Sequence, residues 1–333
     1  MSDQRGEADD AVASADPERR LEYDVVDVFT GRAFAGNPLA VVYGTDGLST
    51  AQLAALANEF HLSETAFPVP LTEVDRAAGA DYRVRIFTPD GEIPFAGHPT
   101  LGAAWALRQR GAIAPGDVVQ ACGAGLIDVH LPNDRSEPVE LGALPRDAAR
   151  ALSAAEVAAT VPLVGLGVED VVGPAHLAGC GLTWLYLPVR SDAVPRSTPS
   201  SVKLSDVAVD TRGLLDPVDG IDVYAADPPW SSRGEVQIRS RVFIPGFGIP
   251  EDPATGSAAA GLGLALVAAG VAAPDGQTTY RVEQGRELGR PSVLWGRVQA
   301  AAGVATRVHV AGKVVHVASG TIVVPDPGTA APA

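Results

Sequence analysis

The chain has 333 residues, of which 46% are hydrophobic and 20% charged, so it can bury the core of one large domain or of two ordinary ones. Its formal net charge at pH 7 is -15 and its only lysines are Lys203 and Lys313, which excludes nucleic acid as a partner because phosphates need a basic face. No apolar, uncharged stretch reaches the length of about 18 residues that suggests a membrane span, and with Cys122 and Cys180 as the only cysteines we expect a reduced, cytoplasmic protein.

The first half of the chain opens with a segment that we expect to be disordered. Residues 1–20 contain several acidic residues but no aromatic residue and no apolar run, which is typical of a disordered tail and unlike a signal peptide. The apolar run at 23–29 predicts a strand. A helix is predicted next, because Ser49 and Gln52 form a capping-box pattern and apolar residues then recur with helical spacing.

A ten-residue motif occurs twice and relates the two halves of the chain. RIFTPDGEIP (85–94) recurs as RVFIPGFGIP (241–250), with Arg, Phe, Pro and Ile-Pro at the same positions. Each copy leads into a helix of small residues, at 96–111 in the first half and 253–270 in the second. A helix without a polar face is buried on all sides, so we predict one buried central helix in each half.

The remaining elements complete two similar α+β halves. We place the boundary near residue 148, because Ser153 and Glu156 form another capping-box pattern and the apolar run at 182–189 corresponds to the opening strand of the first half. Further strands are predicted at 126–131, 280–285, 292–300 and 314–324, and the central helices are predicted to end at Gly111 and Gly270. The predicted organisation is a tail at 1–20, an N-terminal domain at 21–148, a C-terminal domain at 149–324 and a disordered tail at 325–333.

The turns before the two central helices, AGHPT and PATGS, indicate an anion site. Helix starts carry unpaired backbone N–H groups and a positive dipole end. If the halves face each other across a cleft, both ends point into it and suit a carboxylate substrate. Alternatively, the Gly and Pro residues only end strands and begin helices. Either turn alone leaves both interpretations open, whereas the pair favours a site.

Five motifs, in order, resemble those of the phenazine-biosynthesis PhzF-like family. They are AFAGNPLAVV (33–42), LSETAF (62–67), RIFTPDGEIPFAGHPTLGAAWAL (85–107), EDPATGSAAAGLG (251–263) and QGRELGRPS (284–292). The resemblance extends from about residue 23 to 324. It implies the diaminopimelate-epimerase-like fold, an active site between two pseudo-symmetric domains, no cofactor, a homodimer, and an isomerase that moves a proton with one glutamate.

Carried over residue by residue, the resemblance makes Glu64 the catalytic acid/base and gives His98 and Asp252 the roles of holding the substrate and assisting proton transfer. The residues that line the substrate site correspond to Ser63, Gly97, Gly256 and Ser257. The residues alone leave other interpretations open: a solvated loop carboxylate for Glu64, a helix N-cap for His98 and an ordinary turn for Asp252. Asn37 either belongs to the site or only shapes its turn, and the GRPS stretch (289–292) is interpreted as structural.

Rival chemistries lack the residues they need. Related two-thiol racemases carry a cysteine at the start of each central helix, where this sequence has Ala96 and Pro253. Neither lysine lies in a site motif, which disfavours a Schiff-base cofactor. No nucleotide-binding motif and no metal-ligand spacing of histidines occurs, so we predict no cofactor and no metal.

The predicted function is a cofactor-independent isomerase of a small, unsaturated, carboxylate-bearing metabolite, in which Glu64 moves the proton. The expected partners are this small molecule and a second copy of the chain. Leu62, Ala66 and Phe67 flank Glu64 and should desolvate it, which would raise its pKa above about 4.3. The alternative is a non-catalytic metabolite-binding protein that keeps the same cleft.

Overall fold

The computed structural model describes residues 19–210, 218–226, 235–245 and 250–328. In the first half the strands are β1 (Arg20–Val28), β2 (Asn37–Val42), β3 (Thr65–Val69), β4 (Tyr82–Thr88), β5 (Gly91–Ile93), β6 (Gly116–Cys122), β7 (Gly125–Leu131) and β8 (Val139–Ala143), and the helices are α1 (Thr50–Phe60), α2 (Glu73–Ala77) and α3 (Gly97–Gln109). The predicted tails lie mostly outside the described residues, and so does part of the second copy of the repeated motif.

The second half repeats this pattern. Its strands are β9 (Arg150–Ala151), β10 (His176–Cys180), β11 (Leu182–Pro188), β12 (Val218–Ala226), β13 (Glu235–Phe243), β14 (Glu251–Asp252), β15 (Gly276–Gln284), β16 (Ser292–Ala301), β17 (Val304–Gly312) and β18 (Val314–Val323). Its α-helices are α4 (Ala154–Thr160) and α5 (Gly256–Ala268), and its short 3-10 helices are Val161–Val164, Val168–Asp170, Val194–Arg196 and Leu204–Asp206.

The strand pairing confirms the internal duplication. In the first half, β4 pairs antiparallel with β5, the chain continues into α3, and β6 returns parallel to β4. In the second half, β13 pairs antiparallel with β14, α5 follows, and β15 returns parallel to β13. The repeated ten-residue motif therefore marks the same structural unit in both halves, a short hairpin followed by a central helix.

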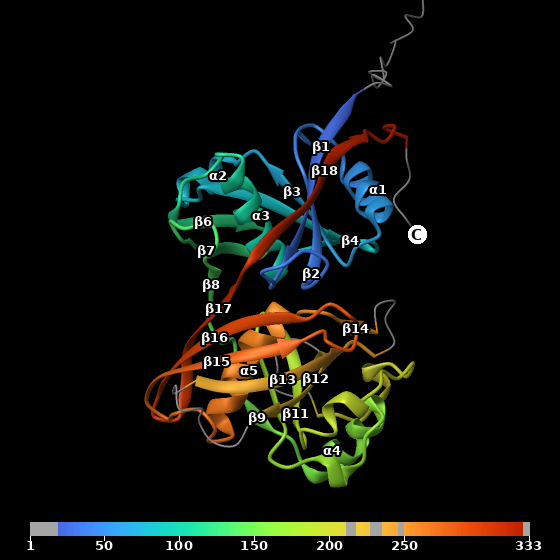
Figure 1. The fold of residues 1–333 in the computed structure, drawn as a ribbon, viewed down its shortest axis with the longest axis vertical. Helices are drawn as coiled ribbons and strands as arrows, with labels where there is room; N and C mark the ends of the chain where they lie inside the picture. Colours follow the sequence, from blue (N-terminus) through green and yellow to red (C-terminus); the bar gives the residue numbers. More distant parts are fainter. Residues whose placement is uncertain (1–18, 211–217, 227–234, 246–249, 329–333) are drawn as a thin grey trace, which may run out of the picture.

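The last strand of the second half joins the first half. β18 follows β17 but pairs with β1 along the whole of β1, whereas β9, the first strand of the second half, pairs with β10 of the same half. β8 and β17 also pair, antiparallel, and join the two sheets. Figure 1 shows β18 running from the lower lobe into the upper one beside β1. Residues 314–323 thus lie beside a first-half strand, and the boundary near residue 148 stays a prediction.

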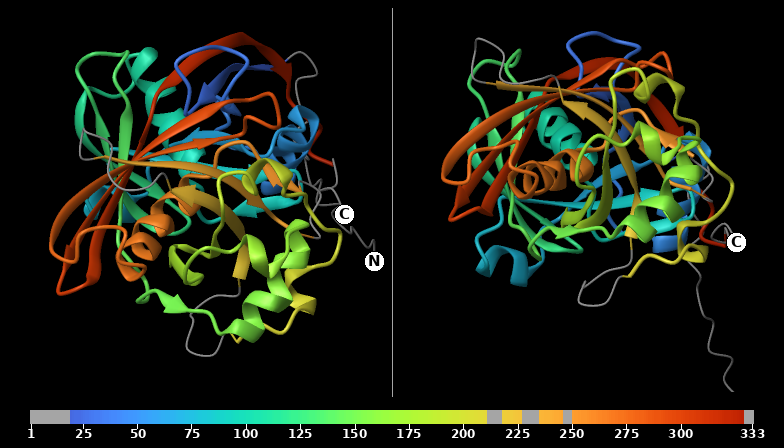
Figure 2. Two further views of the ribbon diagram at one scale, coloured as in Figure 1. Left: turned by 60° about the horizontal axis from the view of Figure 1, so that its bottom comes forward. Right: turned by 90° about the horizontal axis from the view of Figure 1, so that it is seen from below.

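The two central helices are buried, as their composition predicts. Residues 97–108 of α3 and 256–267 of α5 are all buried. Small residues allow the strands to approach closely, since a Cβ at Gly102 would lie 2.5 Å from the side chain of Leu39. Both helices end as predicted, with Gly111 and Gly270 at φ angles of 72° and 69°, which glycine adopts readily. Figure 2 shows the two helices side by side in the interior.

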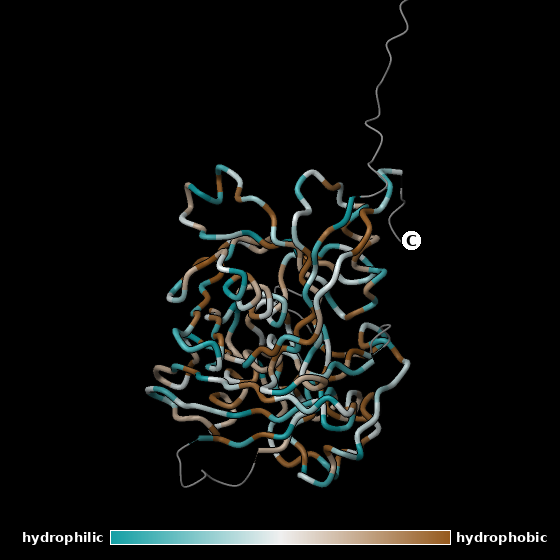
Figure 3. The backbone as a smooth tube through the Cα atoms, turned by 45° about the horizontal axis from the view of Figure 1, so that its top comes forward, coloured by the Kyte–Doolittle hydropathy of each residue, from teal (hydrophilic) through white to brown (hydrophobic). Residues whose placement is uncertain are grey.

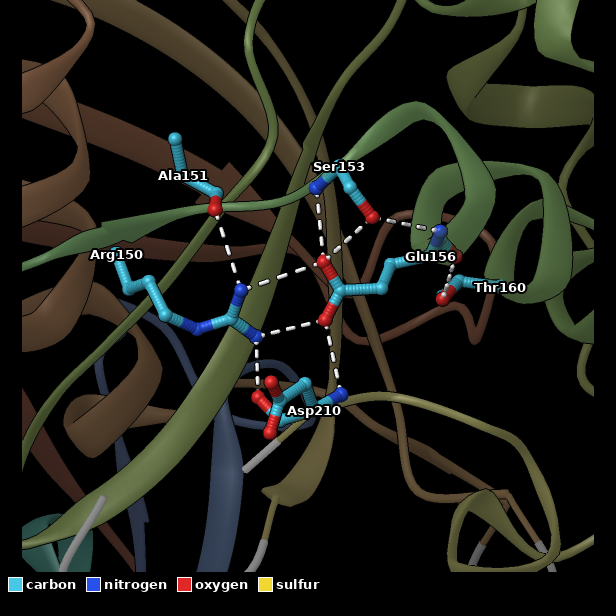
Figure 4. A network of polar contacts seen from close by, with 6 residues as sticks. All are labelled: Arg150, Ala151, Ser153, Glu156, Thr160 and Asp210. Carbon is cyan, nitrogen blue, oxygen red and sulfur yellow. Dashed lines mark hydrogen bonds and ion pairs between the residues drawn. The ribbon is translucent and has the colours of Figure 1, made fainter. Parts of the chain in front are cut away.

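The surface helices are held by local caps. Both predicted capping boxes are confirmed: the Ser49 and Gln52 side chains exchange hydrogen bonds with each other's backbone N–H groups, and Ser153 and Glu156 do the same. Figure 4 shows the second box, in which Glu156 also accepts hydrogen bonds from Arg150 and from the backbone of Asp210. A third box at α2, which the sequence analysis did not predict, joins Thr72 and Asp75.

The tube in Figure 3 shows hydrophilic stretches mostly on peripheral loops and turns, with hydrophobic stretches on the inner strands. Along the part of the chain that the structure describes, none of the helices combines the length and the apolar character that a membrane crossing needs.

Candidate active site

A cavity of about 530 Å³ lies where the two halves meet at the N-terminal ends of α3 and α5. Residues from both halves line it, and among them are all of those predicted for the site: Ser63, Glu64, Gly97, His98, Asp252, Gly256 and Ser257. The rest of the wall is largely apolar and includes Leu62, Ile93, Phe95, Leu182, Trp184 and Ile244. Polar groups that converge in an apolar pocket are what a small-molecule site requires.

The helix ends that face this cavity carry no side-chain cap. A Cβ at Gly97 would lie 3.4 Å from the Cα of Gly256, so the two helices begin almost in contact. The N-cap of α3 is Ala96, which has no polar side chain, and the N-cap of α5 is Thr255, whose hydroxyl donates to Asp252 Oδ2 at 2.6 Å instead. Within the described part of the chain, neither helix start is therefore capped by a side chain at its N-cap, which is the arrangement that an anion site requires.

Glu64 lies between α1 and β3. The chain leaves α1 at His61, which adopts a left-handed conformation with a φ angle of 50°, and the next strand begins at Thr65. The Glu64 side chain is 18% exposed, and its Oε2 lies 3.7 Å from Nε2 of His98. Burial raises the pKa of Glu64 to about 6, although the neighbouring Ser63 hydroxyl acts in the opposite direction. This agrees with the direction of the shift expected from the sequence.

One of the three apolar residues predicted to desolvate Glu64 shares its cavity. Of its three apolar sequence neighbours, Leu62 lines the cavity. Ala66 and Phe67 do not line it, because they are fully buried in the core, where the Phe67 ring packs edge-on against Phe87 at 5.4 Å. The apolar wall around Glu64 is thus formed by Leu62 together with residues from both halves.

His98 is the second residue of α3, and its side chain is only 5% exposed. Burial lowers its pKa to about 4, while the charge of Asp252 and a hydrogen bond with the Pro38 backbone oppose that shift. The imidazole is therefore neutral near pH 7. Among the described residues its buried Nε2 has no hydrogen-bond partner and lies beside the Glu64 carboxyl group.

Asp252 approaches the same point from the second half. Burial and, next, the negative charge of Glu64 raise its pKa to about 7, whereas the charge of His98 and hydrogen bonds from Thr255 and Asn37 act to lower it. The cavity thus holds two carboxyl groups with raised pKa values and a neutral histidine. Groups tuned in this way are typical of acid/base sites.

Buried polar side chains that the sequence analysis missed hold the second-half turn. Gln284 accepts a hydrogen bond from the Thr255 N–H at 3.2 Å and donates to the Asp252 carbonyl at 2.8 Å. Trp184 donates from Nε1 to Ser257 Oγ at 3.2 Å. Buried Trp and Gln side chains need hydrogen-bond partners, so the polar groups of these residue types were the available indication. Their partners lie far away along the chain and could not be named.

The GRPS stretch fastens the turn before β2 to the second half. Arg290 donates to the carbonyl oxygens of Gly36 at 2.7 Å and Ala35 at 2.8 Å. Ser292 donates to the carbonyl oxygen of Pro253 at 2.9 Å. Arg290, Ser292 and the residues that accept these hydrogen bonds are not among the residues that line the cavity. This agrees with the structural role interpreted from the sequence.

The positions that would carry thiols in a two-base racemase contain none. Ala96 lines the cavity, while Cys122 and Cys180 are buried elsewhere and are not among its lining residues. Across the described ranges, no three His, Cys, Asp or Glu side chains are grouped so that they could hold a metal ion.

Comparisons with known proteins agree with this architecture. A family model described as phenazine biosynthesis-like protein matches residues 26–320. Trans-2,3-dihydro-3-hydroxyanthranilate isomerase from Pseudomonas chlororaphis is 33% identical over 325 residues, which cover 90% of this chain and 99% of that protein. Antisense-enhancing sequence 1 from Schizosaccharomyces pombe is 30% identical over 305 residues, which cover 89% of this chain and 96% of that protein.

Solved structures confirm the fold. A phenazine biosynthesis protein of the PhzF family from Bacillus anthracis matches with a TM-score of 0.77 and 24% identity, over 92% of this chain and 99% of that one. A hydroxyproline epimerase from Agrobacterium vitis matches with a TM-score of 0.58 and 16% identity, over 93% and 94%. The α+β, diaminopimelate-epimerase-like fold is thereby confirmed. Because the family model spans nearly the whole chain and several relatives are named as isomerases, the chain belongs to the phenazine-biosynthesis PhzF-like family and is an isomerase.

Proposed function

We propose that the protein is a cofactor-independent isomerase that moves a proton within a small, unsaturated metabolite bearing a carboxylate, with Glu64 as the acid/base. One observation carries the proposal: Glu64, with a pKa raised to about 6, lines a largely apolar cavity in which two uncapped helix ends meet. A base needs the first feature, and a developing negative charge needs the second.

In the proposed reaction the substrate carboxylate binds at the N–H groups of the helix ends near Gly97 and Gly256. The Glu64 carboxylate removes a proton from a carbon next to the conjugated system, which leaves a delocalised anion and a protonated Glu64. Glu64 then returns the proton to another carbon of the same system. Bonds and charges balance without a cofactor, because one C–H bond breaks, another forms and the double bond moves.

The protonation states favour this order of events. At pH 7 a group with a pKa of about 6 is mostly ionised, so Glu64 can accept a proton. Asp252, with a pKa of about 7, is partly protonated and can donate a hydrogen bond to the substrate. His98 is neutral and offers its unpaired Nε2. A base of this strength removes protons only from activated carbon, which is why we propose a conjugated or carbonyl-adjacent substrate.

Deuterium incorporation tests the proposal. The protein is incubated in D2O with trans-2,3-dihydro-3-hydroxyanthranilate, the substrate class in the name of the Pseudomonas chlororaphis relative, and then with a panel of cyclic unsaturated carboxylates. We expect at least one compound to isomerise, as measured by chromatography, and to gain deuterium at the new C–H bond to the extent that the proton on Glu64 exchanges with solvent before it is returned, as measured by mass spectrometry. A compound that binds tightly with neither conversion nor exchange, and no active compound in the panel, would favour a metabolite-binding protein instead.

A further inference from the structure

Asn37 lies behind the cavity wall and is not exposed to the ligand space. It is the first residue of β2 and is 1% exposed. The preceding Gly36 has a φ angle of 67°, and a Cβ there would lie 2.2 Å from the Val28 carbonyl oxygen, so the backbone of this turn has little freedom. Because Arg290 also binds the turn, Asn37 is presented in one orientation.

The amide of Asn37 connects the two segments that carry the carboxyl groups of the cavity. Its Nδ2 donates to Asp252 Oδ1 and to the Ala254 carbonyl oxygen, each at 3.0 Å, and its Oδ1 accepts from Ser63 Oγ at 3.3 Å. Both donor hydrogens thus face acceptors, and the acceptor faces a hydroxyl donor. A flipped amide would place its oxygen against a carboxylate and a carbonyl, so the network fixes the orientation.

We propose that Asn37 is a positioning residue: its amide holds the Asp252 turn of the second half against the Ser63–Glu64 segment of the first half. By donating a hydrogen bond to the Asp252 carboxylate, it also favours the ionised form of that group. The inference rests on the proposed function only for the expected effect of Asn37 on turnover. The expected effect on the pKa of Asp252 follows from geometry, because a donor to a carboxylate oxygen stabilises the ionised form.

The titratable groups that act on Asp252 are Glu64 from the segment before β3 and His98 from α3. Burial and Glu64 favour the protonated acid, while Thr255 and Asn37 favour the carboxylate through hydrogen bonds. Among the described residues, removing the Asn37 donor leaves Thr255 as the side chain that still donates to the Asp252 carboxylate. The pKa of Asp252, raised to about 7 in the intact protein, then rises further, and the turn loses its tie to Ser63.

Two variants separate this role from a general loss of stability. Asn37→Ala removes the amide, and Asn37→Asp keeps its shape but replaces the donor with an acceptor. The matched control is Gln52→Ala, because Gln52 is also a buried amide (6% exposed) but bonds to Ser49 and Pro325. Carbon-13 NMR of protein labelled at aspartate Cγ gives the pKa of Asp252 directly, with Asp252→Asn identifying its resonance.

We expect the pKa of Asp252 to rise by about one unit in Asn37→Ala and by more in Asn37→Asp, since a hydrogen bond to a charged group is lost. Turnover should fall at least tenfold with KM changed less than threefold, while Gln52→Ala loses stability but neither shifts this pKa nor loses turnover. An unshifted Asp252 pKa in a folded Asn37 variant would overturn the inference. The NMR result does not require turnover, so it stands or falls separately from the role of Glu64.

Discussion

The surface helices and the central helices of this protein begin in opposite ways. α1, α2 and α4 all start with a capping box in which side chains satisfy the first backbone N–H groups, as Figure 4 shows for α4. α3 and α5 have no side-chain cap, although they are the most deeply buried helices of the described chain. Unpaired buried donors destabilise a protein, and we therefore interpret these open helix ends as the binding site of the proposed carboxylate ligand.

The contrast between capped surface helices and uncapped central helices can be tested by giving a central helix the cap that it lacks. In Ala96→Asp the new carboxylate would accept hydrogen bonds from the first turn of α3 and occupy the place of the substrate carboxylate. We expect the protein to be as stable as the wild type or more so, but to bind carboxylate ligands at least thirtyfold more weakly, about 2 kcal/mol. Calorimetric titration with a non-reacting carboxylate analogue measures this loss.

Ala96→Val is the control for bulk, since it fills similar space but provides no hydrogen-bond acceptor. Its loss of affinity should be clearly smaller than that of Ala96→Asp. Equal losses in the two variants would mean that the cavity wall, and not the open N–H groups, accounts for binding.

A second test compares the stability of the site at two pH values. The pKa of Glu64 is raised to about 6 in the folded protein from an ordinary value of 4.5. A raised pKa adds stability below the ordinary value, and that stability is lost as the pH rises through 6. Relative to the wild type, Glu64→Gln should therefore be about 2 kcal/mol more stable at pH 8 and little changed at pH 4.

Urea unfolding at both pH values gives these free energies. Asp252→Asn should also have a higher free energy of unfolding than the wild type at pH 8. Its gain should keep growing up to a higher pH than that of Glu64→Gln, because the pKa of Asp252 is raised to about 7. If both variants were less stable than the wild type at pH 8, the two carboxyl groups would stabilise the fold. They would then not be groups that lower stability in exchange for function.

The smallest effect is expected at a surface cap. Ser49→Ala removes the acceptor for the Gln52 N–H at the start of α1 and should lower the free energy of unfolding by about 1 kcal/mol. Ser49→Asp keeps an acceptor there and should restore most of the loss. Turnover should be unchanged in both, whereas a change in turnover would mean that the contrast between surface and central helices is not one between stability and function.

Much of the fold could be predicted because the evidence is local. The Ser49 and Ser153 caps depend on residues three positions apart, and the central helices follow from their small residues. The pairing of β18 with β1 could not be predicted, because Arg20 pairs with Val323 across nearly the whole chain. β17 was missed because Val304–Gly312 is interrupted by polar residues on its exposed face.

The site also has a part that could be predicted from local motifs and a part that could not. The residues predicted to surround the cavity do line it, because each belongs to a motif that is recognisable by itself. The supporting side chains were harder to find: Asn37 bonds to Asp252, 215 positions away, and Trp184 to Ser257, 73 positions away. Pairings at such distances are determined by the fold, and a single sequence contains no local pattern for them.

The central claim is that Glu64 transfers the proton, and one variant tests it most directly. Glu64→Gln keeps the shape and the hydrogen-bonding capacity of the side chain but cannot accept a proton at that position. Once a substrate is identified by deuterium incorporation, we expect this variant to bind it with an affinity within threefold of the wild type and to lose at least a hundredfold in kcat, about 3 kcal/mol. Near-normal turnover with deuterium still entering the product would contradict the account, because another group would then be the base.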